Sequence, residues 1–366
     1  MSTTSVNPIS SFASSDQPGG TPPLVSIAKE GRTPLGDRAL RILATGSAVA
    51  ILLMMGVLIV VLVHSAIPSF HAFGPSFLAT SAWRPNELTH PKRNAEGKIQ
   101  RDEDGEIITE TVPPSFGALP VIYGTAVSSA LALLFAVPLS FGASLFLVRI
   151  APRWMVPPAS FLIEFLAAIP SIAYGLWGLF VLAPILQSTI EPPINRFFGL
   201  FEHVPLLRNL ASDATTGRDM FCAGLILAIM ITPIITAISR DVLRAVPKIQ
   251  IEGAMALGAT WWQSAWQMLR YARSGLFGAV MLGLARAAGE TMAVAMVIGN
   301  LPSVRASPFA PAQTMSSVLA NEFAEASTDL HRAALLEVAL ILLGMSLIFN
   351  VVARFLVVGK QTAAGN

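Results

Sequence analysis

The residues best suited to chemistry lie where the chain is otherwise apolar. Arg286 and Glu290 fall four positions apart in the apolar stretch 274–299, and on one helix they would share a face. A charged side chain at the centre of a bilayer costs about 2.5–3.5 kcal/mol on insertion scales, so such residues face protein or water and are candidates for function. The pair lies on a stripe of small residues, typical of closely packed membrane helices, formed by Gly275, Ala279, Gly283 and Ala287.

Two roles for this pair stay open from the residues alone. Arg286 offers a permanent cation to an anionic solute, and Glu290 weakens that attraction enough for the solute to leave again. Alternatively, the two charges neutralise each other and only permit insertion into the membrane. Both roles place the pair at a helix–helix contact or beside a solute pathway.

Other polar residues in apolar stretches are weaker candidates. Glu164 precedes Pro170, which leaves a backbone carbonyl without its helical partner, so a neighbouring helix or a cavity is expected beside it. Ser171 follows that proline directly. For Ser171 and Thr291, as for Glu164, two roles stay open, one in the solute pathway and one in the structure. Glu337 lies near the start of the last apolar stretch, where interface water can satisfy it, and we expect a structural role there.

Motifs for enzymatic or metal chemistry are absent from the sequence. It contains neither His-Glu-x-x-His nor Gly-x-Ser-x-Gly, and its five histidines form no ligand-spaced cluster. The single cysteine, Cys222, lies in an apolar run and is expected to be a small buried residue. No Gly-x-x-x-x-Gly-Lys-Ser/Thr segment is present, because Gly359-Lys360 is followed by Gln361. We therefore expect a protein that is not an enzyme and binds no metal or cofactor of its own.

Composition indicates a membrane protein. Hydrophobic residues make up 53% of the chain and charged residues 13%, against about 25% charged residues in soluble domains. A spanning helix needs about 20 mostly apolar residues. The predicted fold class is therefore an all-α membrane protein with six transmembrane helices, with kinks expected at Pro138 and Pro170. The six stretches are 42–64, 120–148, 159–186, 220–239, 274–299 and 332–358.

These stretches divide the chain into successive regions. Residues 1–38, rich in Ser, Pro and Gly, are expected to form a disordered tail, and 39–68 the first transmembrane helix. A polar periplasmic loop or insertion, 69–117, separates it from a core of five helices over 118–358, and 359–366 form a second tail. Lys and Arg are concentrated in the short loops on the side of both tails, so both termini are predicted to be cytoplasmic.

Two loops on the opposite side carry local structural signals. Residues 98–101 and 106–109 alternate in polarity on either side of Asp104-Gly105, which favours a β-hairpin, with a flexible polar loop as the alternative. In the last outer connection, 320–325 predict a short surface helix.

The cytoplasmic loop 240–273 combines helix signals with hydrophobic residues. A helical pattern over 248–257 follows a proline, Gly258 interrupts it, and Thr260 with Gln263 fits a capping box that starts a second short helix. The loop has more hydrophobic side chains than an aqueous segment needs, which indicates a helix that docks into a partner's groove. They are Ile249, Ile251, Met255, Leu257, Trp261, Trp262 and Trp266.

Within this loop, Glu252-Gly253-Ala254 followed by Gly258 resembles the Glu-Ala-Ala…Gly loop of ABC importer permeases. The resemblance implies the type I ABC importer permease fold. It also implies that these four residues belong to a coupling helix that docks on a separate ATPase. Gly253 stands where the family usually has Ala or Ser, and Arg270-Tyr271 replaces the usual Leu-Pro, so the resemblance says less about the return into the next span.

Longer stretches resemble the PstC-type permeases of phosphate-specific (Pst) ABC transporters. The resemblance covers about two thirds of the chain and implies an importer of inorganic phosphate in the bacterial inner membrane that works by alternating access. It assigns the family's transport-critical Arg and Glu to Arg286 and Glu290. The stretches that carry it are 116–125, 167–179, 283–294 and 319–326.

The same resemblance implies a set of partners. They are the sister permease PstA, two copies of the ATPase PstB, which would bind ATP and Mg²⁺, and the periplasmic phosphate-binding protein PstS. The substrate rests on the resemblance, because one arginine serves phosphate, sulfate and molybdate alike. A permease for another oxyanion and a phosphate-sensing membrane scaffold are the alternatives.

Overall fold

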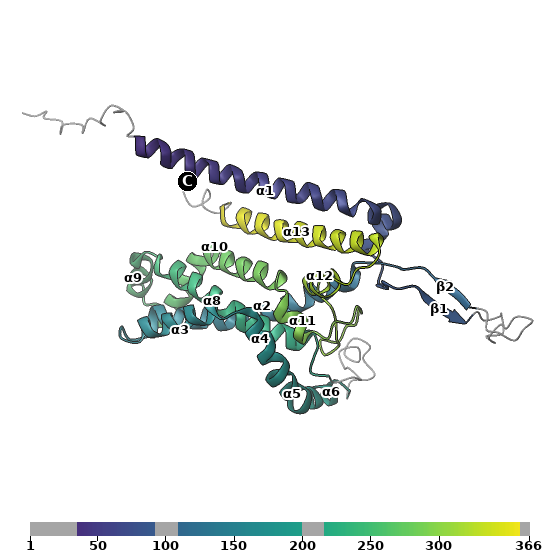
Figure 1. Cartoon of the computed structure of the whole chain (residues 1–366). Coiled ribbons are helices and arrows are strands. Elements are labelled where there is room, and N and C mark those ends of the chain that lie inside the picture. Colours follow the sequence, from purple (N-terminus) through teal and green to yellow (C-terminus); the bar gives the residue numbers. More distant parts are fainter. Residues whose placement is uncertain (1–34, 92–108, 200–215, 359–366) are drawn as a thin grey trace, which may run out of the picture. The chain divides into compact units, whose positions relative to one another are not determined.

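The computed structural model describes residues 35–91, 109–199 and 216–358, most of which are helical (Figure 1). The chain divides into two units, residues 1–58 and 59–366. Among the described residues, five helical stretches are long and apolar enough to cross a membrane, which agrees with the predicted class, while the total of six stays a prediction. The five are Gly36–Leu78, Leu119–Ile150, Ser171–Phe197, Met220–Arg244 and Asp329–Val352.

The first helix, α1 (Leu35–Phe73), is longer than predicted at both ends. It begins inside the predicted 1–38 tail, because Asp37 in its first turn interacts favourably with the positive end of the helix. It also passes the predicted end at residue 68 and continues into η1 (Gly74–Leu78). The rest of the predicted tails, 1–34 and 359–366, lies outside the described residues.

A two-stranded antiparallel ribbon follows in the predicted insertion. β1 (Leu88–Pro91) pairs with β2 (Thr109–Val112). Arg84 and Ser115 extend the ribbon by one isolated bridge. The predicted hairpin around Asp104-Gly105 falls mainly on 92–108, outside the described residues, so it stays a prediction.

Two long helices form the centre of the second unit. α2 (Leu119–Leu145) and α8 (Met220–Arg244) pack along each other and nearly coincide with two predicted spans. α2 continues into the π-helical turn η2 (Phe146–Ile150). Small residues allow the close packing, because a Cβ on Gly224 would lie only 2.7 Å from the Leu131 Cβ. Cys222 is buried in this core, as expected.

The third predicted span, 159–186, is not one helix. α3 (Val156–Ala168) ends before Pro170, and Ile169 is extended with φ −65° and ψ 131°. The helical conformation is disfavoured for a residue that precedes a proline. The kink predicted at Pro170 is therefore a complete break in the structure. The chain then continues through α4 (Ser171–Trp177), η3 (Gly178–Leu182), α5 (Ala183–Ile185), η4 (Leu186–Ile190) and α6 (Glu191–Gly199).

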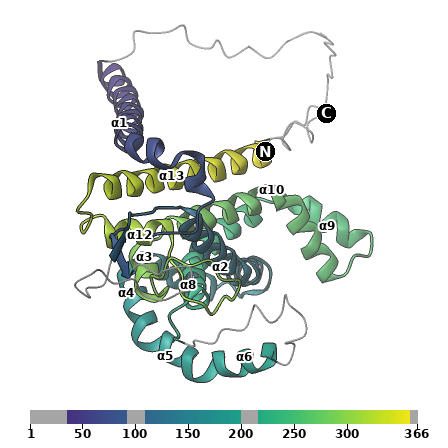
Figure 2. The ribbon, with the colours of Figure 1, turned by 90° about the vertical axis from the view of Figure 1, so that its right-hand side faces the viewer.

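The loop predicted to hold two short helices contains one. α9 (Lys248–Ala256) ends before Gly258, whose φ of +86° confirms the predicted interruption. α10 (Trp261–Ala288) starts at the predicted capping box and continues without a break to Ala288 (Figure 2). The predicted second short helix is therefore wrong. No proline follows the cap within α10, and its glycines, Gly275, Gly278 and Gly283, do not end a helix that packs along α8.

The last part of the chain consists of α11 (Met292–Val297), α12 (Met315–Glu322) and α13 (Asp329–Val358). The surface helix predicted at 320–325 is wrong in position, because α12 ends at Glu322, while residues 320–325 are exposed or half-buried as predicted. α12 begins after a capping box at Thr314, and its first residues are buried. It belongs to a second apolar core that includes Phe77, Trp83, Phe116, Met315, Val318 and Leu335.

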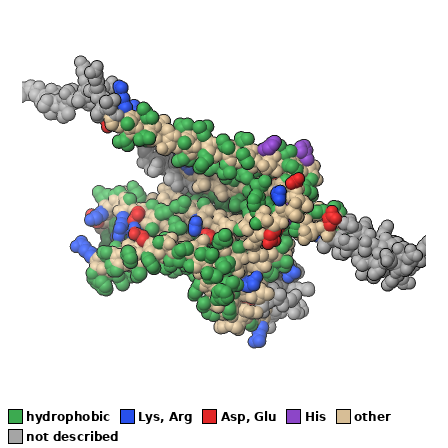
Figure 3. All heavy atoms as spheres, viewed as in Figure 1, with side chains coloured by type: hydrophobic (Ala, Val, Ile, Leu, Met, Phe, Trp, Pro, Cys, Tyr) green, Lys and Arg blue, Asp and Glu red, His purple; other side chains and the backbone are tan. Residues whose placement is uncertain are grey.

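The exterior of the bundle is apolar. Figure 3 shows hydrophobic side chains over most of the visible face, with Lys and Arg gathered at the end that carries α9. Phe180 on η3 is 72% exposed and Leu139 on α2 is 63% exposed. Soluble monomers rarely expose so much contiguous apolar surface. The second unit is therefore built to be covered by lipid and by other membrane chains.

Gly124 on α2 provides a test of the packing between α2 and the segment before α12. A Cβ at this position would overlap the Gln313 carbonyl oxygen, so we expect Gly124→Ala to lower the stability by roughly 1–3 kcal/mol. Gly142→Ala on the same helix is the control, because a Cβ there meets nothing within 4 Å. Thermal unfolding of the detergent-solubilised protein measures both effects, and equal midpoints for the two variants would contradict the packing.

Candidate functional site

The predicted Arg286–Glu290 pair forms at a break in the fifth predicted span. α10 ends at Ala288, and residues 289–291 are not helical before α11 starts at Met292. Arg286 Nη2 nevertheless lies 3.2 Å from Glu290 Oε2. The contact is present, but the expected reason for it, a shared helix face in one continuous span over 274–299, is wrong.

The two members of the pair differ strongly in exposure. The side chain of Glu290 is 4% exposed and that of Arg286 is 52% exposed. A buried carboxylate requires an opposite charge, whereas a guanidinium has five N–H donors and can use them on more than one side. An anion can therefore bind the open side of Arg286 while Glu290 holds its inner side.

The small residues of α10 form a separate face. A Cβ on Gly275 would lie 2.6 Å from Val242 Cγ1, and one on Gly283 would lie 2.6 Å from Ile235 Cδ1. Both neighbours belong to α8, so the small face packs on that helix. Arg286 lies on the exposed flank of α10 instead, and the expectation that the pair sits within the close-packed stripe is corrected.

The non-helical stretch is held by the start of α12. Ser316 Oγ donates a hydrogen bond to the Glu290 carbonyl oxygen at 2.6 Å. The Met315 N–H donates to Thr125 Oγ1 on α2 at 2.9 Å. The backbone of Glu290 is thereby fixed to α12, and α12 is fixed to α2.

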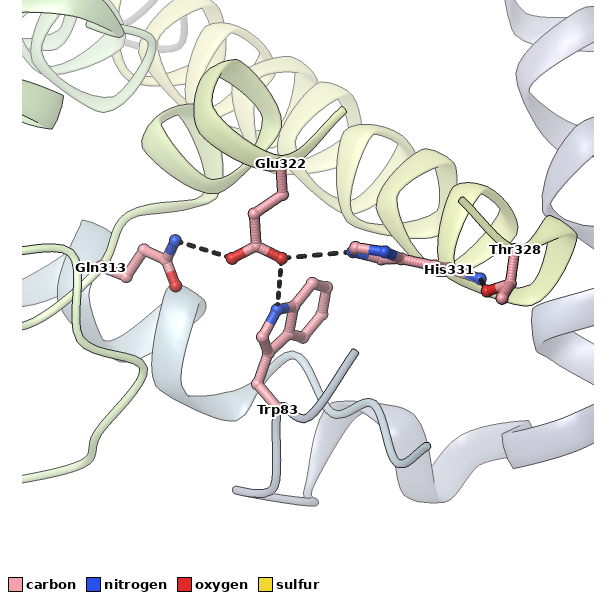
Figure 4. Close-up of polar contacts among 5 residues, drawn as sticks. All are labelled: Trp83, Gln313, Glu322, Thr328 and His331. Carbon is pink, nitrogen blue, oxygen red and sulfur yellow. Dashed lines mark hydrogen bonds and ion pairs between the residues drawn. The ribbon is translucent and has the colours of Figure 1, made fainter. Parts of the chain in front are cut away.

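The other end of α12 carries a hydrogen-bonded network (Figure 4). Glu322 Oε2 accepts from Trp83 Nε1 at 2.8 Å and lies 3.2 Å from His331 Nε2. Glu322 Oε1 accepts from Gln313 Nε2 at 3.1 Å. The Phe116 ring stacks on the His331 ring with centroids 5.2 Å apart. This network joins both bases of the β1–β2 ribbon to α12 and α13.

The Glu164 carboxylate contacts an arginine on a neighbouring helix. Its Oε1 lies 3.7 Å from Arg240 Nη2 on α8, and the Arg240 side chain is only 10% exposed. Arg240 also contacts Asp241 at 3.0 Å. Of the two roles predicted for Glu164, this contact supports the structural one.

The remaining predicted residues lie apart from one another. Ser171 is the first residue of α4, and Thr291, in the break, donates to the Gly289 carbonyl oxygen at 3.3 Å. Glu337 is 3% exposed. Interface water was expected to satisfy Glu337, and this is wrong because Glu337 is buried and lies in the third turn of α13, which already begins at Asp329.

The turn between α9 and α10 exposes hydrophobic side chains, as predicted. Leu257 is 92% exposed, Ile249 73% and Trp262 62%. Glu252, Gly253 and Gly258 are exposed and Ala254 is half-buried. Exposure of hydrophobic side chains to water is unfavourable, so this surface is suited to contact another molecule.

A pair of buried carboxyl groups was not predicted. Glu191 at the start of α6 and Asp219 before α8 are both 0% exposed. Asp219 Oδ1 accepts from the Cys222 N–H at 2.8 Å. Burial, and secondarily the nearby Glu191 carboxyl, raise the pKa of Asp219 to about 8. An Asp directly before a long apolar run is a helix-cap signal that identifies this residue in the sequence.

The arrangement suits anion binding better than catalysis. Arg286 presents a half-exposed cation whose partner, Glu290, is buried. Within the described ranges, no group of three or more His, Cys, Asp or Glu side chains could hold a metal ion.

Comparison with known proteins gives consistent matches. The family of binding-protein-dependent transport system inner membrane components matches residues 136–359. A Pasteurella multocida protein described as "Phosphate transport system permease protein PstC" is 41% identical over 87% of this chain and 90% of its own length. A protein of the same description from Mesorhizobium japonicum is 38% identical, over 91% and 94%. An inward-facing MetNI methionine ABC transporter structure aligns with 66% of this chain and 94% of its own, at 17% identity and a TM-score of 0.43.

The Trp83–Glu322 hydrogen bond can be tested with a double-variant cycle. Trp83→Phe keeps an aromatic ring against Phe116 but removes the donor, and Glu322→Gln removes the charge of the acceptor. A hydrogen bond to a charged group contributes on the order of 1.5–3 kcal/mol, so we expect each variant to lower the thermal stability. The double variant should lose less than the sum, because both changes act on one bond.

The control for this cycle is Trp154→Phe, which changes a tryptophan that is 75% exposed and should leave the stability nearly unchanged. Strictly additive losses in the cycle would show that Trp83 and Glu322 act independently.

Proposed function

Because the chain belongs to the family of binding-protein-dependent transport system inner membrane components, we propose that it is the permease subunit of an ATP-driven importer of inorganic phosphate. Relatives described as phosphate permeases, which align with up to 91% of the chain, support the substrate. The structural observation that carries the proposal is a half-exposed arginine tied to a buried carboxylate at a break in a membrane helix.

Arg286 would bind phosphate during its passage. The planar guanidinium matches two oxygens of a phosphate group at once. Glu290, 3.2 Å away on the inner side, lowers the net positive charge of the site, so that phosphate is bound weakly enough to leave. Phosphate is carried without chemical change, which agrees with a subunit that has no enzymatic activity.

The pathway would lie between this chain and a second permease. The guanidinium of Arg286 is exposed on the flank of α10, where a sister permease of the PstA type would complete the site. A phosphate-binding protein of the PstS type would deliver the solute on the side of the β1–β2 ribbon. Both termini would lie in the cytoplasm, and transport would proceed by alternating access.

The energy would come from two copies of a PstB-type ATPase. The exposed side chains of the α9–α10 turn form a hydrophobic surface, which we assign to docking in a groove of that ATPase. ATP and Mg²⁺ would bind to the ATPase and not to this chain.

The role of the ion pair is tested by removing it in two steps. Arg286→Gln leaves the buried Glu290 carboxylate without its partner, at a cost of about 3–5 kcal/mol, so both stability and phosphate uptake should fall. Arg286→Gln combined with Glu290→Gln removes both charges and should restore stability. Uptake of labelled phosphate by the reconstituted complex should stay at least tenfold below that of the unchanged protein.

A pair that only permits membrane insertion would give a different result, because the double variant would then recover transport together with stability. Competition by sulfate and molybdate in the same assay identifies the substrate. Inhibition of phosphate uptake by either anion at equal concentration would contradict specificity for phosphate.

The docking surface is tested at its most exposed residue. Leu257→Ser removes a side chain that makes few contacts within this chain, so the fold should be retained while binding of the ATPase weakens by about tenfold. Co-purification of the ATPase with the solubilised permease measures the effect. Gln267→Ser, an exposed polar position on α10, is the control, and equal recovery of the ATPase with both variants would exclude Leu257 from the contact.

A further inference from the structure

A groove lies between α9 and the ends of two central helices, and Ile251, Glu252 and Met255 of α9, named above for docking, also line it. Its volume is about 410 Å³. Three cations line it, and each comes from a different element: Arg149 from η2, Arg244 from the last turn of α8 and Lys248 from the start of α9. Glu252 is the one carboxylate in the lining. The groove therefore carries an excess of positive charge.

These cations lack ion-pair partners among the residues that the structure describes. Arg149 Nη2 contacts the Ser264 hydroxyl at 3.4 Å, while its Nε is buried and has no hydrogen-bond acceptor. Neighbouring Arg240, one turn before Arg244, contacts both Glu164 and Asp241. A buried guanidinium N–H without an acceptor is unfavourable, and three cations without ion-pair partners in the described part of the chain make the groove suited to an anion.

The rest of the lining is apolar. Val148, Ile251 and Met255 form part of the wall, and Met255 is 51% exposed. Arg149 and Arg244 lie at the ends of the membrane-spanning stretches Leu119–Ile150 and Met220–Arg244. Cations above an apolar wall at this level match a phospholipid, which has a charged phosphate and an apolar chain.

We propose that this groove binds the phosphate group of an anionic phospholipid. The assignment uses the cytoplasmic placement of α9 from the proposed function, but it does not depend on what the protein transports. The lipid phosphate would accept hydrogen bonds from Arg149 and Arg244 and pair with Lys248. It would thereby tie α9 to the ends of α2 and α8. Free cytoplasmic phosphate shares this chemistry, but the apolar wall and the position at the span ends favour the lipid.

The test measures how fast an amine reagent modifies Lys248 in the intact complex, by mass spectrometry. Nanodiscs containing phosphatidylglycerol are compared with nanodiscs of phosphatidylcholine alone. We expect Lys248 to react several-fold more slowly in phosphatidylglycerol. Arg244→Gln should weaken this protection by about fivefold, the effect of one cation near an anionic lipid surface. Arg153→Gln, an exposed cation of the same loop as Arg149 that does not line the groove, should retain full protection and controls for surface charge.

Three outcomes would overturn the proposal. Equal modification rates in both lipids would show that no anionic lipid binds. Protection by inorganic phosphate in phosphatidylcholine nanodiscs would identify free phosphate as the ligand. Protection in both lipids that disappears when the ATPase is removed would show that the ATPase fills the groove. Native mass spectrometry of the unchanged complex, which should retain bound phosphatidylglycerol, gives a readout that does not depend on any variant.

Discussion

The carboxylate of Glu290 is almost fully buried, and a buried charge is stable only when an opposite charge and hydrogen bonds replace the lost water. Arg286 supplies the charge from the last turn of α10. The chain leaves helical geometry at 289–291, so the carboxylate reaches Arg286 from outside the helix. Ser316 then holds the freed backbone. The end of α10, the break and the start of α12 thus depend on one another.

The elements that sequence identified are those with local causes. α2 and α8 follow from long apolar runs, the start of α10 from Thr260 and Gln263, and the end of α9 from Gly258. In each case residues within one or two turns determine the conformation. The break at 289–291 contains no proline, and its local signals are Gly289 at the end of α10 and Thr291 before α11; a hydrogen bond from Ser316 in α12 adds a long-range contact.

The same difference between local and long-range causes applies to the residues of the candidate site. Arg286 and Glu290 stand out because charged residues in an apolar run are costly wherever they point. The contacts of Glu322 cannot be recognised from the sequence, because Trp83 is 239 positions away along the chain. A polar residue in a polar loop is unremarkable until folding brings its donors together. A charged residue within an apolar run can therefore be recognised from the sequence, whereas a hydrogen-bonded network between distant residues cannot.

The unbroken course of α10 has a mechanical consequence. Its 28 residues span about 42 Å at 1.5 Å per residue, from the exposed α9–α10 turn past Arg286 to Ala288. A rigid helix can carry a displacement along its axis, so Arg286 would move together with the α9–α10 turn. Glu290 lies beyond the break and is fastened to α12. A displacement of α10 along its axis would therefore change the distance between the Arg286 guanidinium and the Glu290 carboxylate, and with it the strength of their ion pair.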